Sequence, residues 1–417
     1  MTLQALKDKA KNQKQTTMYL YLLLLLLSVV STTSRNLPGK QFFGYNVVNL
    51  QSGNFSSDAA YAIATKSLNV GILRYPGGNL ADFWNWRTGW CVNTTSANGC
   101  PKCKNPCVNK SEKRIYRLEE FQIAIQATDA TSVLMMNMLT SNIQDQLEFL
   151  SHAQSIGILQ SGTYIELGGE FYWGKYSQRW NDGKIYATEA NVWATAIKAQ
   201  FPDVRVMAVA AHSTANQSPQ DRGYMWNGLV YSTLNTKVVD GVTLHPYLHL
   251  DNTSGGNSPL QPGVPPRTKG QGPTGWFNSA TVQQQNVDFL NSESGIEKLL
   301  GVPFFVATSA LGNEATHQPL PADLRMIITE TNVMERAGPL KLSWLHGLFM
   351  SATVFNLLSV RQIDAVLLHV LLNGYGWGAL VSCFQRLFFC FVVFKSCLIR
   401  IDANFSLYVI QTTLFSV

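Results

Sequence analysis

The sequence has little charge and lacks the signatures of several common enzyme classes. Asp, Glu, Lys and Arg make up only 14% of its 417 residues, whereas 46% are hydrophobic. No Gly-rich phosphate loop follows the first apolar run, which disfavours an open nucleotide-binding sheet. The sequence has no Gly-x-Ser-x-Gly elbow of a serine hydrolase, and no His-x-x-x-His pair lies on an expected helix. We therefore expect function without a cofactor or a metal ion.

A basic stripe through the body of the chain is also missing. The formal net charge is +6, but four lysines against Asp8 leave +3 of it in the first 14 residues. Three basic residues against Asp402 leave a further +2 in the tail, so the body carries about +1. Nucleic-acid-binding proteins concentrate cations on one face. We therefore expect no nucleic acid partner.

The N-terminal apolar run is short for a membrane span. The lysine-rich start is followed by the apolar run 18–30 and then by small polar residues, a pattern typical of a secretory signal. Residues 1–34 are expected to be a signal peptide, with an uncleaved membrane anchor as the alternative. The protein should thus be extracellular or in the cell wall, and should touch a membrane only through an uncleaved N-terminal segment.

Cysteine usage agrees with secretion. Four of the seven cysteines crowd one polar stretch: Cys91, Cys100, Cys103 and Cys107. In a secreted chain this pattern predicts two disulfides in preference to half a zinc site, although the spacing does not tell which cysteines pair. Sequons that fit glycosylation stand at Asn54, Asn93, Asn109, Asn216 and Asn252.

Apolar runs alternate with helix-like stretches along the chain. Most of the runs are continuous, as in parallel strands that are buried on both faces. The pattern predicts one (β/α)8 TIM barrel over residues 40–378, with a doubly wound sheet as the alternative. The expected strands are Phe42–Val48, Val70–Tyr75, Val133–Leu139, Tyr164–Leu167, Val204–Ala210, Gly241–Tyr247, Met326–Thr329 and Ala365–Leu372. Expected helices include Leu118–Ala127, Ile143–Ile156, Ala187–Gln200 and Val282–Leu300.

Three segments stand apart from this pattern. Residues 84–114 and 251–280 form long connections after barrel strands, where binding loops belong, although they could also be plain surface insertions. The apolar segment 379–417 is of uncertain status. It could be an extra element packed on the barrel, a degenerate anchor, or sequence foreign to the mature message. The last is favoured because the regular pattern stops after Gly378.

Two carboxylates stand at the ends of expected strands. Glu170 follows a short strand and two glycines and precedes three aromatic residues, and Glu330 closes the strand Met326–Thr329. Rings beside Glu170 should raise its pKa enough for proton donation near neutrality. Two such carboxylates at one barrel mouth suit the cleavage of a glycosidic bond.

Structural roles for these acids remain open. Glu170 could instead cap the next helix at the surface, and Glu330 could be the buried partner of Arg74 or Arg325. Glu166 is a rival for the acid role, but it lies deeper in its strand. A structural ion pair therefore suits it better.

The second expected strand continues into Arg74-Tyr-Pro-Gly-Gly-Asn79 and an aromatic-Asn-Trp segment that ends at Trp86. This stretch resembles the second barrel strand of α-L-arabinofuranosidases of glycoside hydrolase clan A, which also includes heparanase-like endo-β-glucuronidases. The strands of Glu170 and Glu330 resemble the fourth- and seventh-strand carboxylates of that clan. The resemblance covers roughly residues 40–378. It implies a retaining mechanism, with Glu170 as acid/base and Glu330 as nucleophile.

The resemblance also implies substrate-binding residues around these acids. Arg74 lies just below the mouth, and His245 and Tyr247 close the sixth strand, although His245 could instead be a satisfied core histidine. Apart from the resemblance, Trp377 follows the eighth strand and could stack on the apolar face of a sugar or line the barrel as core. The clan has an Asn before the acid that hydrogen-bonds the sugar, whereas this chain has Gly169. Asn137, at the end of the third strand, is expected to take over that hydrogen bond.

Other residues have a weaker case. His212 follows the fifth strand, and Trp84 and Trp86 could line outer subsites or simply pack in their loop. Relatives often append a β-sandwich, for which residues 379–417 are too few, so either that module is missing or the chain is incomplete. The expected fold is a barrel without a clear C-terminal β-sandwich.

The sequence therefore predicts a retaining O-glycoside hydrolase acting on a polysaccharide or glycoconjugate. The alternative is a catalytically silent carbohydrate-binding barrel, because Gly169 replaces the usual Asn and the tail is unusual.

Overall fold

The structure is a computed structural model. It describes residues 42–47, 59–92, 96–97, 100–104, 117–211, 222–248, 320–333, 350, 353–354, 357 and 360–369. The expected signal peptide, the helix Val282–Leu300, the loop 251–280 and the tail from residue 379 lie outside these residues.

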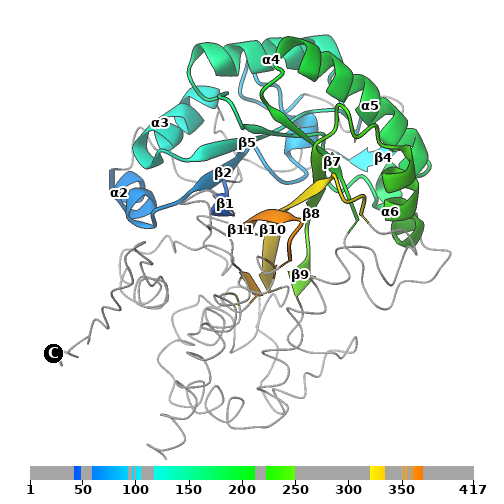
Figure 1. Ribbon diagram of the computed structural model, residues 1–417. Helices are drawn as coiled ribbons and strands as arrows, with labels where there is room; N and C mark the ends of the chain where they lie inside the picture. Colours follow the sequence, from blue (N-terminus) through cyan, green and yellow to red (C-terminus); the bar gives the residue numbers. More distant parts are fainter. Residues whose placement is uncertain are drawn as a thin grey trace, which may run out of the picture.

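Eight parallel strands close into a barrel (Figure 1). The last of them pairs in parallel with both its predecessor and the first, which closes the sheet. Around the barrel they are β1 Phe43–Asn46, β2 Ile72–Tyr75, β5 Thr131–Met135, β6 Tyr164–Glu166, β7 Arg205–Val209, β8 Gly241–Leu244, β10 Arg325–Val333 and β11 Ile363–His369. The short β9 Tyr247–Leu248 pairs with the end of β10, and β3 Ser96–Ala97 with β4 Cys100–Lys104 forms a separate antiparallel pair.

Helices cover the outside of the barrel in an arc that Figure 1 shows around the strands. They are α2 Ala59–Ser67, α3 Leu118–Thr128, α4 Ile143–Ser155, α5 Gly183–Gln200 and α6 Arg222–Thr233. Two short 3-10 turns, η2 Ala81–Phe83 and η3 Gly174–Tyr176, follow β2 and β6. This alternation confirms the (β/α)8 TIM barrel predicted from the sequence.

The core has an inner and an outer part. Ile72 of β2, Val133 of β5 and Ile327 of β10 belong to the cluster inside the barrel, whereas Leu73 and Leu134 belong to the larger cluster under the helices. Neighbouring residues of a strand point to opposite faces, and both faces are buried here. This explains why the apolar runs are continuous in the sequence.

Some element boundaries differ from the expected ones. The chain leaves the sheet after Met135 instead of Leu139, because the side-chain oxygen Oδ1 of Asn137 accepts a hydrogen bond from Thr140 N (2.9 Å) and starts a turn. Helix α5 begins four residues earlier than expected, because the Asp182 carboxylate caps it by accepting from Ile185 N (2.9 Å).

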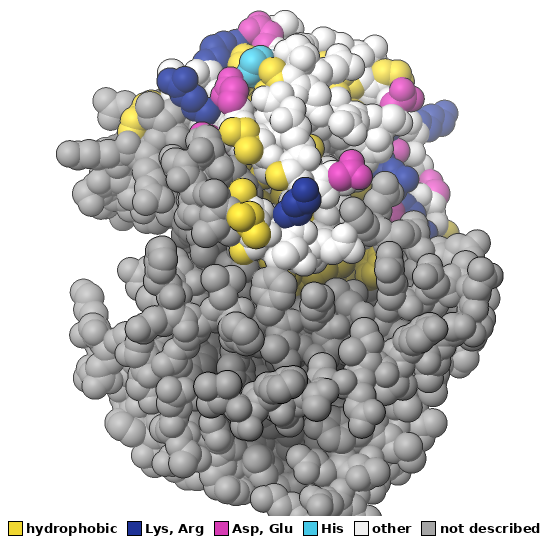
Figure 2. All heavy atoms as spheres, turned by 90° about the vertical axis from the view of Figure 1, so that its left-hand side faces the viewer, with side chains coloured by type: hydrophobic (Ala, Val, Ile, Leu, Met, Phe, Trp, Pro, Cys, Tyr) yellow, Lys and Arg dark blue, Asp and Glu magenta, His cyan; other side chains and the backbone are white. Residues whose placement is uncertain are grey.

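The outer surface mixes charges of both signs. On the face shown in Figure 2, which is the side of α2 and α3, Lys and Arg side chains lie interspersed with Asp and Glu on the described part. Among the described helices, none combines the length and the apolar character that crossing a membrane would require.

Candidate active site

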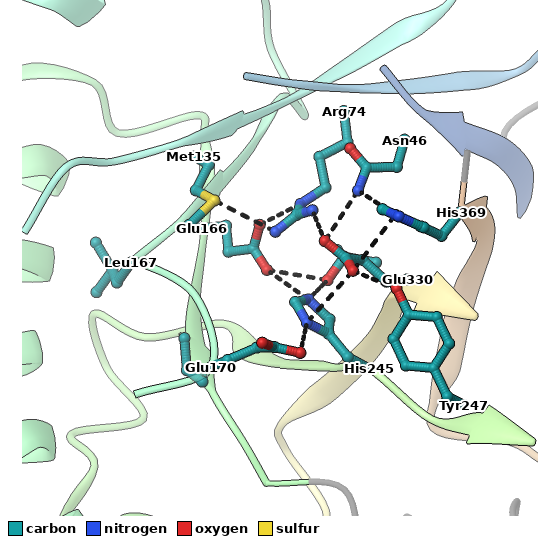
Figure 3. A network of polar contacts seen from close by, with 12 residues as sticks. Asn46, Arg74, Met135, Glu166, Leu167, Glu170, His245, Tyr247, Glu330 and His369 are labelled. Carbon is teal, nitrogen blue, oxygen red and sulfur yellow. Dashed lines mark hydrogen bonds and ion pairs between the residues drawn. The ribbon is translucent and has the colours of Figure 1, made fainter. Parts of the chain in front are cut away.

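Glu170 and Glu330 meet at the carboxyl ends of the barrel strands (Figure 3). One carboxylate oxygen of each, together with one ring nitrogen of His245, all lie within 4.8 Å of one another. The two acids are 160 positions apart in the sequence. The barrel therefore brings them to one place, as the sequence interpretation required.

The local backbone directs both acids into the site. β10 pairs with β11 with a register shift between Ile328 and Thr331, a bulge that includes Glu330. Bulges re-aim side chains and are frequent beside active sites. Glu170 has a positive φ of 51° in the loop after β6. A left-handed residue other than glycine is strained and is retained where surrounding contacts hold it.

Glu330 is surrounded by hydrogen-bond donors. Its Oε1 accepts from Arg74 Nη1 (2.6 Å) and Asn46 Nδ2 (2.9 Å), and its Oε2 accepts from the Tyr247 hydroxyl (2.6 Å). His369 Nδ1 lies 3.4 Å from Oε2, and the side chain is only 6% exposed. The carboxylate is therefore held in one orientation.

These neighbours keep Glu330 ionised. Burial raises its pKa, but the positive charges of His245 and Arg74 and the hydrogen bond from the Tyr247 hydroxyl together hold the pKa well below its usual 4.5. An ionised carboxylate with fixed orientation suits a nucleophile.

Glu166 lies beneath the two meeting acids and is fully buried. Its Oε2 pairs with Arg74 Nε at 2.5 Å, and its Oε1 accepts from Thr329 Oγ1 at 2.9 Å. Burial raises its pKa, but Arg74 and His245 lower it further. The structure thus gives Glu166 the ion pair that the sequence favoured for it.

Arg74 bridges Glu166 and Glu330 and has no exposed side-chain surface. Its Nη2 also contacts Met135 Sδ at 3.3 Å. The expectation that it binds substrate is corrected here, because a side chain without solvent access holds Glu330 instead of reaching a sugar. The same contacts match the alternative of a buried ion pair for Glu330.

His245 lies among all three carboxylates. Its Nδ1 is 3.3 Å from Glu170 Oε1 and 3.9 Å from Glu330 Oε2, and its Nε2 is 3.5 Å from Glu166 Oε1. Burial lowers its pKa, but the charge of Glu330 and the hydrogen bonds of Glu166 and Glu170 raise the pKa to about 10. His245 is therefore protonated at neutral pH.

The expected rise in the pKa of Glu170 is not found. Burial does raise the pKa, but the hydrogen bond and charge of His245 outweigh it and leave the pKa below 4.5. The flanking rings were visible in the sequence, whereas the cation supplied from β8 was not. Trp173 Nε1 also donates a hydrogen bond to Glu170 Oε2 (3.1 Å). The alternative role as a helix cap is not found, because Glu170 caps no helix among the described residues.

Asn137 does not reach the acids, which corrects its expected role. Its amide nitrogen donates to the Trp84 carbonyl (3.1 Å) and to Thr140 Oγ1 (2.8 Å), and the residue is 2% exposed. The position before Glu170 is filled differently: a Cβ at Gly169 would lie 2.5 Å from the Met135 methyl. The Met135 side chain therefore occupies the space that a side chain at position 169 would need.

The loop tryptophans pack as plain loop residues. Trp84 is 3% exposed and meets Phe149 edge to face, and Trp86 stacks on His152 with ring centroids 5.6 Å apart. His212 and Trp377 lie outside the described residues. Cys91 is disulfide-bonded, and the pairing of the other cysteines stays a prediction.

Asn46 and His369 were missed by the sequence interpretation. Each closes a barrel strand, β1 and β11, and Asn46 Nδ2 lies 3.1 Å from His369 Nδ1. Burial lowers the pKa of His369, partly offset by Glu330. A polar residue at the carboxyl end of an expected barrel strand was the available signal.

One ligand atom each of Glu170, His245 and Glu330 could approach a metal ion. Arg74 and the protonated His245 already supply two positive charges to the three carboxylates. Among the described residues, this cluster therefore suits proton transfer and charge stabilisation without further cations.

No known family profile matches the sequence, and a search of curated proteins finds no match. Solved structures do share the fold. The GH51 α-L-arabinofuranosidase of Thermotoga petrophila RKU-1 is 16% identical, with a TM-score of 0.50, over 85% of this chain and 69% of that one.

Two further structures are similar at lower scores. The α-L-arabinofuranosidase of Thermotoga maritima is 16% identical, with a TM-score of 0.48, over 82% of this chain and 66% of that one. A 4-O-α-L-rhamnosyl-β-D-glucuronidase of Fusarium oxysporum 12S is 12% identical, with a TM-score of 0.44, over 79% and 63%. This chain spans about two-thirds of the length of these structures. What this chain shares with the arabinofuranosidase of Thermotoga petrophila RKU-1 is the barrel fold.

Proposed function

We propose that this barrel hydrolyses O-glycosidic bonds in a polysaccharide or glycoconjugate with retention of configuration. The carrying observation is that oxygens of Glu170 and Glu330 lie within 4.8 Å of each other. Retaining enzymes hold their two carboxyl groups about 5–5.5 Å apart, whereas inverting enzymes need about 6.5–9.5 Å to admit a water.

Glu330 is the proposed nucleophile. It is ionised, oriented by Arg74, Asn46 and Tyr247, and 6% exposed. Its attack on the anomeric carbon forms a glycosyl ester and expels the leaving oxygen. That oxygen needs a proton.

Glu170 is the proposed acid/base, since it is the most exposed of the three acids at 18%. Protonated His245 lies 3.3 Å away and can pass a proton to Glu170, which then delivers it to the leaving oxygen. The charge of Glu330 raises the pKa of Glu170 and His245, and ester formation removes that charge. Glu170 then remains ionised and can activate the water of the second step.

The decisive variant is Glu330→Gln, tested on 4-nitrophenyl arabinofuranoside, glucuronide, xyloside and glucoside. The fold shared with arabinofuranosidases makes the first of these the leading choice. We expect kcat/KM to fall by roughly a thousandfold or more, because no covalent ester can form. Glu148→Gln, at an exposed acid, is the matched control. In wild type, NMR of the first sugar released should show the anomer of the substrate.

Unchanged activity in the Glu330 variant would remove the proposed nucleophile. A silent carbohydrate-binding barrel is the second candidate, motivated by Gly169 before the acid. Oligosaccharide binding without turnover, retained in Glu170→Gln and Glu330→Gln, would favour it.

We also propose that the protein is secreted, with residues 1–34 removed. The disulfide of Cys91 supports an oxidising compartment. N-terminal sequencing of protein from culture medium tests this, and recovery of residue 1 only in membranes would contradict it.

A further inference from the structure

We propose that Trp173 is the binding platform for the departing sugar: its half-exposed indole ring stacks on that sugar while its N–H holds Glu170. The inference rests on the proposed glycosidase function and goes further, because it assigns the subsite on the leaving-group side. Three observations carry it.

Trp173 marks the solvent side of the acid. Its Nε1 donates to Glu170 Oε2 (3.1 Å), while Glu170 Oε1 faces His245, which is 4% exposed. The solvent-exposed fraction increases from Glu330 (6%) to Glu170 (18%) and to Trp173 (44%), so Trp173 lies on the outer side of the acids. The acid protonates the oxygen between the two sugars. With one sugar at Glu330, the other lies on the outer side, beside Trp173.

The loop after β6 buries its other rings. Exposure is 3% or less for Phe171, Tyr172, Tyr176 and Trp180, so Trp173 alone among these aromatic residues stays half open. A single exposed ring is ordinary. A ring whose N–H is hydrogen-bonded to the acid and which remains 44% exposed has the form of an amphipathic stacking surface.

The platform is held in place. Arg222 Nη1 donates to the carbonyls of Phe171 (2.6 Å) and Trp173 (3.3 Å), and its Nη2 donates to that of Trp180. The Tyr172 ring packs beside Trp173 with centroids 5.3 Å apart. A surface fixed before binding loses less entropy when a ligand arrives.

The test compares leaving groups on the same glycone: arabinobiose with α-L-arabinofuranosyl fluoride, xylobiose with β-D-xylosyl fluoride, and cellobiose with β-D-glucosyl fluoride. Fluoride leaves without a ring to stack and without a proton. In Trp173→Ala, we expect the disaccharide-to-fluoride ratio of kcat/KM to fall about tenfold or more, mainly through KM. Trp90→Ala, at another exposed tryptophan (38%), should leave the ratio unchanged.

Trp173→Phe separates the two roles and guards against misfolding of the alanine variant. The phenyl ring keeps the stacking face, so KM for the disaccharide should stay within about threefold. Without the N–H the carboxylate form of Glu170 is less stable, its pKa rises, and the basic limb of the pH profile moves to higher pH. If Trp173 had only a structural role, the basic limb of the pH profile would not move.

Two failures are distinguishable. If wild type turns over no disaccharide, no fluoride and none of the four 4-nitrophenyl glycosides, the glycosidase function fails and the platform with it. If wild type turns over both and Trp173→Ala changes their ratio less than twofold, the platform alone is overturned.

Discussion

At the scale of single residues, two arginines each contact two carboxylates in opposite surroundings. Arg74 joins Glu166 and Glu330 without exposed surface, whereas Arg87 joins Asp145 and Glu148 with 44% of its side chain exposed. Removing one partner of a buried pair leaves an uncompensated charge, but water replaces a lost surface partner. The two sites form a matched pair.

We predict that Arg74→Met lowers the free energy of unfolding by about 3–5 kcal/mol. Arg87→Met should change it by about 1 kcal/mol or less. Urea denaturation of both variants measures the difference. Equal losses would show that the charge of Arg74 does not stabilise Glu166 and Glu330.

Only some residues of the site could be predicted from the sequence. Glu170, Glu330 and His245 stood out because polar side chains ended apolar runs, and the structure brings these three together. The direction of the Glu170 pKa shift could not be read, because it depends on the distance to His245 across 75 positions of sequence. Asn137 also ends an apolar run, but its side-chain amide is hydrogen-bonded to Thr140 in the turn that follows.

At the scale of elements, the spacing of β1 and β2 depends on Gly44. A Cβ there would lie 2.0 Å from the carbonyl oxygen of Ile72, which is backbone and cannot rotate away. Asn46, two residues further on, donates to Glu330. The close approach of β1 to β2 therefore also sets the position of Asn46 beside Glu330.

We predict that Gly44→Ala destabilises the fold by roughly 1–3 kcal/mol and lowers kcat, because β1 must shift away from β2. Gly174→Ala is the stability control, since no atom would lie within 4 Å of its added Cβ. Thermal unfolding and hydrogen exchange at β1 measure the effect. A Gly44 variant as stable as the control would contradict the close approach.

Elements were predictable where burial repeats along the chain. Continuous apolar runs placed the strands, since both faces of each are covered. Ends were less predictable, because caps and pairing decide them: Asp182 extends α5 at its start, and β9 pairs with the end of β10, which runs to Val333. The first depends on one capping hydrogen bond and the second on a pairing of two positions, and neither leaves a periodicity in the sequence.

At the scale of the whole molecule, the charge cluster ties stability to pH. His245 has a pKa raised from 6.5 to about 10, so its contribution is complete below pH 6.5 and lost as pH rises toward 10. Glu166, Glu170 and Glu330 have lowered pKa values, so their contributions are present above 4.5 and lost as pH falls. The cluster therefore stabilises most between these limits.

We predict that wild type loses a few kcal/mol relative to His245→Gln when the pH rises from about 6 to about 10, since one pKa unit corresponds to about 1.4 kcal/mol. Urea denaturation at about pH 6, 8 and 10 measures the difference between the two proteins. A difference that stays constant across this range would mean that His245 is neutral throughout.

Closure of the barrel by β1 and β11 sets the order in which the site can be completed. Asn46 and His369, which meet beside Glu330, are 323 positions apart. A chain is synthesised from its N-terminus, so Asn46 is made long before the last strand exists. Until that strand docks, the Glu330 carboxylate lacks its neighbour His369, and an unfinished chain cannot form the complete site.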